Sequence, residues 1–176
     1  MATFTRDGLG NAVGFDLNGT LAGYWAAALR IITGYWFLNA GVTKFAFVAG
    51  EPFDASGYLL NGTAGSPIHG FFVWAAQTPW LLELTNVVIP VGEALIGLGL
   101  LVGGLVRLAS FFGGVLMVFF YLGNASWSHG VVNGDLMGLL LFVTVGVLGA
   151  GRVLGLDALL EQTDVGSSRA ARYLLG

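Results

Sequence analysis

The stretch from Leu108 to Leu122, LASFFGGVLMVFFYL, decides the fold, because it contains no charged residue. It lies in a segment, 106–122, that is close to the length of about 20 apolar residues needed to cross a bilayer. Segments 21–47, 79–104 and 136–151 have the same apolar character. We therefore predict an all-α integral membrane protein that folds as an antiparallel bundle of four transmembrane helices.

The composition of the whole chain agrees with this prediction. Only 10% of the 176 residues are charged and 56% are hydrophobic, whereas about 25% of the residues in a soluble domain are charged. These values exclude an ordinary soluble domain, a disordered chain and a nucleic-acid-binding protein with a basic patch. The chain has no cysteine, which excludes thiolate metal sites and cysteine nucleophiles. Its 29 glycines favour close packing of helices inside a bilayer.

The positive charges outside the bilayer predict the orientation of the chain. They lie in the N-terminal tail, 1–20, in the link between the second and third spans, and in the C-terminal tail, 152–176 (Arg6, Arg107, Arg152, Arg169 and Arg172). The loops 48–78 and 123–134 contain no Lys or Arg. Because positive residues are retained on the cytoplasmic side, we predict that both termini are cytoplasmic and that both of these loops face outward.

The first outer loop is long enough to have structure or a function of its own. Its segment 67–76 is apolar but too short to cross the bilayer, so it either lies in the membrane interface or dips into the bundle. At the end of the loop, Thr78 and Pro79 are suited to be the N-cap and first residue of the second span.

Two charged residues lie deep in the predicted spans. At about 1.5 Å per residue, Arg30 is about 14 Å and Glu93 about 16 Å from the inner ends of their helices. Consecutive antiparallel helices are neighbours, so we predict an intramembrane ion pair between Arg30 and Glu93. A charged residue at this depth is costly and usually functional, although a purely structural pair is the alternative.

Other charged and polar residues mark the predicted outer ends of the spans. Lys44, Glu83 and Asp135 are expected to surround an outward-facing mouth, and Asn39 and Asn86 lie about one turn deeper. Together they predict a polar track towards the level of Arg30 and Glu93. Simpler roles are also open: Lys44 reaching the headgroups, Glu83 favouring the start of its helix, and Asp135 acting as an N-cap.

Pro90 sharpens the prediction of a site in the second span. It has no backbone N–H, so the carbonyl of Asn86 loses its helical partner. Glu93 lies one turn further along on nearly the same face. A kink with a free carbonyl, an amide and a carboxylate is suited to bind a ligand or a proton, and such defects are tolerated in a membrane where they line a cavity.

The two histidines, His69 and His129, both fall in the predicted outer loops. They are able to hold a metal or relay protons, but a solvated or hydrogen-bonded histidine explains them as well. No metal spacing and no flavin or nucleotide motif is visible in the sequence, so no metal ligand is assigned.

Two stretches resemble the DoxX/DoxD family of small membrane proteins. They are residues 30–45, RIITGYWFLNAGVTKF, and residues 92–104, GEALIGLGLLVGG, followed by Arg107. The resemblance implies a four-helix bundle in the plasma membrane of a prokaryote. It also implies oxidation of thiosulfate to tetrathionate with a quinone as the electron acceptor, together with a second redox subunit or a homo-oligomer.

Carried onto this chain, the resemblance makes Arg30, Lys44 and Glu93 the candidate catalytic residues. The candidate residues for binding substrate or quinone are those of the polar track and outer loops: Asn39, Glu83, Asn86, Pro90, His129 and Asp135. Two alternatives to a quinone-linked oxidoreductase stay open. One is a non-catalytic subunit that stabilises a respiratory complex, and the other is a pathway for protons or small solutes.

Overall fold

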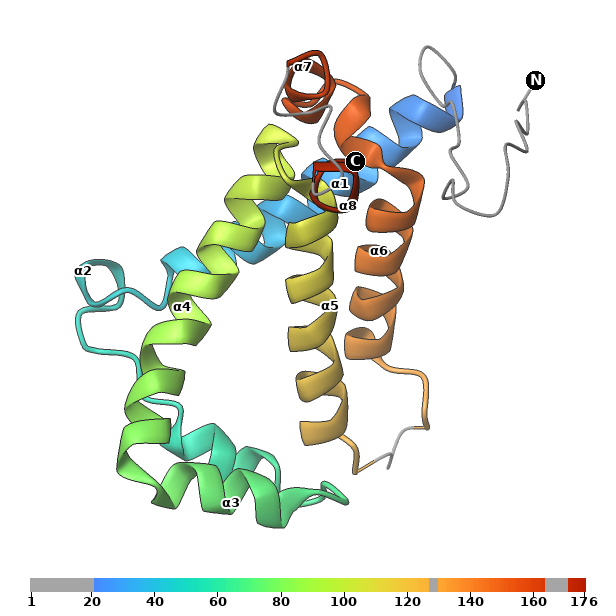
Figure 1. Ribbon diagram of the computed structural model, residues 1–176. Helices are drawn as coiled ribbons and strands as arrows, with labels where there is room; N and C mark the ends of the chain where they lie inside the picture. Colours follow the sequence, from blue (N-terminus) through green and yellow to red (C-terminus); the bar gives the residue numbers. More distant parts are fainter. Residues whose placement is uncertain (1–20, 127–129, 164–170) are drawn as a thin grey trace.

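The computed structural model describes residues 21–126, 130–163 and 171–176, and these contain helices and no strand (Figure 1). Four helices are long: α1 (Leu21–Val42), α4 (Pro79–Val102), α5 (Val106–Gly123) and α6 (Gly134–Leu148). The others are short: α2 (Ala46–Ala49), the π-helical turn η1 (Tyr58–Gly62), α3 (His69–Gln77), the 3₁₀ turn η2 (Ala150–Arg152), α7 (Asp157–Leu160) and α8 (Ala171–Leu174). The predicted N-terminal tail lies outside the described residues.

Glycines let α1 and α4 pack closely in antiparallel directions. Gly34 lies against the backbone of Gly97 and Leu101, where an added Cβ would be only 2.8 Å from the Leu101 nitrogen. Gly41 lies against Ala94, and Gly97 lies against the backbone of Leu38. No larger side chain fits at these contacts, which is the use of small residues expected between helices in a membrane.

A second antiparallel pair is formed by α5 and α6, which run side by side in Figure 1. Gly113 of α5 makes room for the ring of Phe142, and Gly146 of α6 packs against Ser110. Phe142 also contacts Phe37 of α1, with ring centroids 4.6 Å apart. This aromatic contact joins the two helix pairs in one hydrophobic core.

The long helices expose much of their apolar surface. Leu95 of α4 is 63% exposed and Phe111 of α5 is 64% exposed. Within the described residues, α4 and α5 are the two helices long and apolar enough to cross a membrane, and α6 is apolar but shorter. Soluble proteins rarely expose such continuous apolar surface. The fold is thus compatible with a helical membrane protein.

Several predicted boundaries differ from the structure in an informative way. As predicted, α4 begins at Pro79, whereas α1 ends at Val42, so that residues 43–45 form a turn. The apolar segment of the first outer loop becomes α3, which packs on α4 and buries Phe72 and Ala75. This helix packs across the end of α4, and both alternatives for the segment stay open.

The start of α5 is capped by a residue far along the chain. Asp157 is fully buried, and its carboxylate accepts hydrogen bonds from the amides of Leu105 (2.7 Å), Val106 (3.0 Å) and Gly176 (3.0 Å). A carboxylate at this position satisfies amides that have no partner within the helix. Asp157 therefore ties the segment after α6 to the beginning of α5.

Candidate functional site

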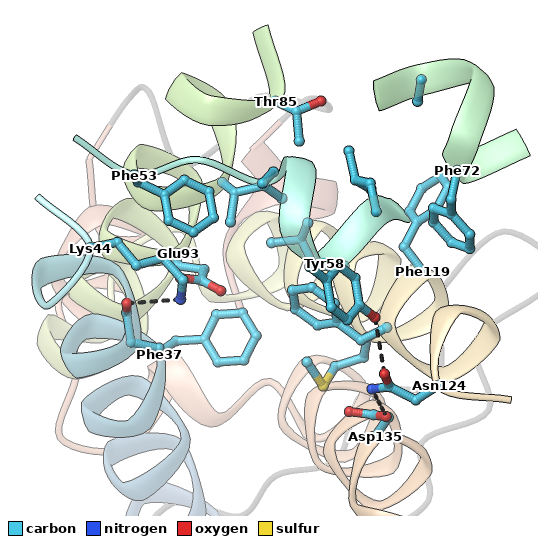
Figure 2. Close-up of a pocket in the computed structure, with 18 of the residues that line it drawn as sticks. Phe37, Lys44, Phe53, Tyr58, Phe72, Thr85, Glu93, Phe119, Asn124 and Asp135 are labelled. Carbon is cyan, nitrogen blue, oxygen red and sulfur yellow. Dashed lines mark hydrogen bonds and ion pairs between the residues drawn. The ribbon is translucent and has the colours of Figure 1, made fainter. Parts of the chain in front are cut away.

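A cavity of about 620 Å³ lies between α1, α4, α5 and the segment that carries η1 and α3. This volume is in the range of pockets that bind small organic molecules. Eight aromatic side chains line the cavity: Trp36, Phe37, Phe53, Tyr58, Phe71, Phe72, Phe119 and Phe120. Figure 2 shows the rings of Phe37, Phe53, Tyr58, Phe72 and Phe119 around the cavity, with hydrogen-bonded polar groups at two positions.

The first polar place is an ion pair between α4 and the turn after α1. Lys44 Nζ lies 2.6 Å from Glu93 Oε2 and donates a second hydrogen bond to the carbonyl of Ala40 at 3.0 Å. The ammonium also lies 5.9 Å from the centre of the Phe53 ring. Glu93 is only 3% exposed, so the charge of Lys44 is what makes a carboxylate acceptable here.

The second polar place is a chain of three side chains near the opposite wall. The Tyr58 hydroxyl donates to Asn124 Oδ1 at 3.1 Å, and Asn124 Nδ2 donates to Asp135 Oδ2 at 2.8 Å. Burial, and secondarily the nearby charge of Asp135, raises the pKa of Tyr58 to about 12. The hydroxyl therefore stays protonated at neutral pH and remains a hydrogen-bond donor.

The segment that covers the cavity is held to α4 by one amide side chain. Asn86 Oδ1 accepts a hydrogen bond from the backbone N–H of Ala55 at 2.8 Å. Just before it, Asp54 accepts hydrogen bonds from the hydroxyl (2.6 Å) and the N–H (2.9 Å) of Ser56. These two bonds lower the pKa of Asp54. Asn86 thus contributes to the site by positioning this segment and does not line the cavity itself.

The predicted ion pair between Arg30 and Glu93 is wrong. Arg30 is fully buried, and its guanidinium donates to the carbonyls of Leu100 (2.8 Å), Leu101 (3.4 Å), Val153 (3.3 Å) and Leu154 (3.0 Å). Two of these bonds are made to the C-terminal end of α4, where carbonyls lack helical partners, and the other two join it to the segment after η2. Arg30 is not among the residues that line the cavity.

The helix register explains why Lys44 takes the place predicted for Arg30. Gly34 lies beside Gly97 and Leu101, and Gly41 lies beside Ala94. Arg30, one turn before Gly34, therefore reaches the end of α4, whereas Lys44 lies close to Glu93. The prediction placed the inner ends of the two helices at the same level, and α1 is in fact shifted along α4.

The predicted ring of charges around a mouth is formed only in part. Lys44 and Asp135 line the cavity, but Glu83 is exposed on α4 and is not among the lining residues. Asn39 is also exposed and does not line the cavity, and Pro90 is buried at the contact with α1. The predicted polar track towards Arg30 is therefore wrong, because its members do not share one space.

Several alternative roles can be compared with the structure. The N-cap of α6 is Asn133, whose Oδ1 accepts from the N–H of Leu136 at 3.0 Å, so Asp135 is free of that role. His69 shares a hydrogen bond with Thr63, with 2.9 Å between Nδ1 and Oγ1. His129 lies outside the described residues. Among the residues that the structure describes, no group of three His, Asp or Glu side chains is placed to hold a metal ion.

Sequence reasoning missed the aromatic wall and Tyr58. The sequence does contain two signals, because the first outer loop is long with an apolar segment at 67–76, and Asn124 lies in a loop that also contains Ser126, Ser128 and Asn133. The sequence alone does not show how the loop folds, and it is this fold that brings Tyr58 to Asn124, 66 positions further along the chain.

Comparison with protein-family models, with curated proteins and with solved structures finds no match to this chain. The site is therefore interpreted from its own geometry. An apolar, aromatic cavity with an ion pair at one place and a neutral phenol at another is suited to a flat, largely apolar molecule that carries polar atoms at its edge.

Proposed function

We propose that the protein spans a prokaryotic plasma membrane four times, with both termini in the cytoplasm, and reduces a quinone bound in the cavity. The exposed apolar surfaces of α4 and α5 support the membrane location. The positive charges in the tails and in the link between these helices support the orientation. In this arrangement the cavity lies towards the outer side, beneath the segment that contains η1 and α3.

The observation that carries the proposal is the ion pair inside an aromatic cavity. A quinone ring is planar and apolar, and it stacks favourably on aromatic side chains. Its oxygens need hydrogen-bond donors, and Lys44 has a third N–H beyond those directed at Glu93 and Ala40. The pair thus supplies binding and a proton at the same position.

The chemistry of the proposed reaction balances with two electrons. Two thiosulfate ions join through a new S–S bond to form tetrathionate and release two electrons. The quinone takes up these electrons and two protons to become a quinol. One proton comes from the Lys44–Glu93 pair, which lies at one quinone oxygen and is reprotonated from water after each turnover.

The sulfur donor rests on the resemblance of residues 30–45 and 92–104 to the DoxX/DoxD family. Two of the three residues carried over from that resemblance, Lys44 and Glu93, meet in the cavity. Arg30 is assigned a structural role instead. A second redox subunit or another copy of this chain belongs to the same proposal, because the chain offers no residue that carries electrons by itself.

The proposal is tested with purified protein in lipid nanodiscs, thiosulfate and a short-chain ubiquinone analogue, by following quinone absorbance. The unmodified protein is expected to reduce the quinone, and Glu93→Gln is expected to lose about a hundredfold in rate, the size of a general acid–base contribution. Glu83→Gln is the matched control, since this exposed carboxylate does not line the cavity.

Two outcomes would contradict the proposal. One is the absence of quinone reduction with every sulfur donor tried, even after co-expression with neighbouring redox subunits. The other is activity that survives Glu93→Gln in a co-purified complex, which would identify a non-catalytic subunit.

A further inference from the structure

The Lys44–Glu93 pair accounts for one of the two protons that a quinone needs. Reduction of a quinone places one hydrogen on each of two oxygens at opposite edges of the ring. A site with a single polar group leaves the second oxygen without a hydrogen-bond partner. The described residues that line the cavity include two carboxylates, Glu93 and Asp135.

Asp135 has hydrogen-bonding capacity that its neighbours do not use. Its Oδ2 accepts from Asn124 Nδ2 at 2.8 Å, and among the described residues no donor reaches its other oxygen. Asn133 performs the capping of α6, so Asp135 is not needed there. Asn124 is itself fixed by the Tyr58 hydroxyl, which holds the carboxylate in one orientation.

Glu93 has the same kind of free capacity. Its Oε2 accepts from Lys44, and its Oε1 has no donor among the described residues. Figure 2 shows Glu93 and Asp135 at separate positions around the cavity, with the aromatic rings between them. A diol with a flat ring matches this arrangement, because each hydroxyl is able to donate to one carboxylate.

We infer that Asp135 is a second ligand-binding residue, whose carboxylate accepts a hydrogen bond from the quinol hydroxyl that lies far from Lys44. This inference rests on the proposed function. The proton of that hydroxyl comes from water, which reaches the partly exposed Asp135, and the electrons come from the sulfur donor.

The inference predicts that the cavity distinguishes the two redox forms of its ligand. A quinol donates to both carboxylates, whereas a quinone has no hydrogen to donate. A hydrogen bond to a charged group contributes about a tenfold or larger change in affinity. The quinol is therefore expected to bind about tenfold more tightly than the matching quinone.

The test measures the binding of duroquinone, its quinol and the dimethyl ether of the quinol by quenching of tryptophan fluorescence, in nanodiscs without oxygen. Asp135→Asn is expected to weaken quinol binding about tenfold and to change quinone binding less than twofold. Glu83→Gln is expected to leave both unchanged. The dimethyl ether, which cannot donate, is expected to bind the unmodified protein about tenfold more weakly than the quinol, which tests the inference without a variant.

The outcomes separate this inference from the proposed function. If neither redox form binds the unmodified protein, both are overturned. If the quinone binds and is reduced, but quinol, quinone and ether bind equally well, the role of Asp135 is overturned and the proposed function stands. An equal loss of affinity for all three ligands in Asp135→Asn likewise overturns the role of Asp135, since it indicates a general disturbance of the cavity.

Discussion

Arg30 and Glu93 are both buried ions of the α1–α4 pair, yet their surroundings differ. Arg30 donates to four backbone carbonyls, lies against Gly103, and has only its Nε without a partner among the described residues. Glu93 has one ion-pair partner and faces an open cavity. A buried charge whose bonds are used by the backbone serves the fold, whereas one with unused capacity beside a cavity is available to a ligand.

The largest expected loss of stability comes from removing the charge of Arg30. Arg30→Met removes four hydrogen bonds to buried carbonyls and a positive charge that interacts with the buried Asp157. We expect a loss of about 3–5 kcal/mol in the free energy of unfolding, as for other broken buried charge networks. Thermal unfolding in detergent measures it. Arg30→Lys is the control and is expected to recover only part, because an ammonium cannot bridge the two pairs of carbonyls.

Quinone binding by Arg30→Met tests whether Arg30 has a role in the cavity as well as in the fold. The protein that remains folded is expected to bind the quinone analogue with unchanged affinity, since Arg30 does not line the cavity. A normal melting temperature together with lost quinone binding would contradict the roles assigned to Arg30 and Glu93.

The next largest effect is expected at the helix contact that sets the register. A Cβ at Gly97 would collide with the backbone of Leu38, whereas one at Gly92 meets nothing within 4 Å. Gly97→Ala is expected to cost about 1–3 kcal/mol by overpacking. Gly92→Ala, on the same helix, is expected to be neutral or to gain about 0.5–1 kcal/mol. Chemical denaturation of the two variants in parallel gives both values, and equal stabilities would refute the close contact.

A smaller effect on stability is expected from the ion pair in the cavity. Lys44→Met leaves a buried carboxylate without a partner, and Glu93→Gln leaves an ammonium that is only partly exposed. We expect each single variant to lose about 1–2 kcal/mol and the double variant to lose less than their sum, with a coupling of about 1 kcal/mol. A double-mutant cycle of unfolding free energies measures the coupling. Strict additivity would show that the two charges do not interact.

The smallest effect is expected at Asp54, the exposed carboxylate that accepts hydrogen bonds from Ser56. The pKa of Asp54 is lowered by its bonds from Ser56, so its contribution is present above the unfolded value of about 3.9 and is lost as the pH falls through the lower folded value. The melting temperature of Asp54→Asn is expected to lie slightly below that of the unmodified protein at pH 6 and to approach it near pH 3. A difference that grows on acidification would contradict this sign.

The sequence predicted the helical class and the presence of charge in the spans better than it predicted which charges meet. Apolar runs and charge depletion are local signals, and they place α4 and α5 correctly. The pairing of Glu93 depends on the shift of α1 along α4, which is set by glycine contacts. Depth counted from assumed helix ends cannot reveal such a shift, because a displacement of about three turns brings a different residue opposite Glu93.

The role of Asp157 was hidden for a related reason. In the sequence, Asp157 stands close to Leu159, Leu160 and Glu161, a pattern typical of an amphipathic turn on the surface. The two leucines are exposed and Glu161 is partly exposed. Its burial follows from amides at the start of α5, which lies 51 positions earlier in the chain. Only the folded chain shows that these unpaired amides need a distant carboxylate.

The covering segment has a hydrophobic cluster of its own, formed by Ala55, Leu59 and Phe72, apart from the core between the long helices. Small, separately packed units open at lower free energies than whole domains unfold, so we expect this segment to open before the long helices separate. Under the proposed function, such an opening would admit and release the ligand without a change in the register between α1 and α4.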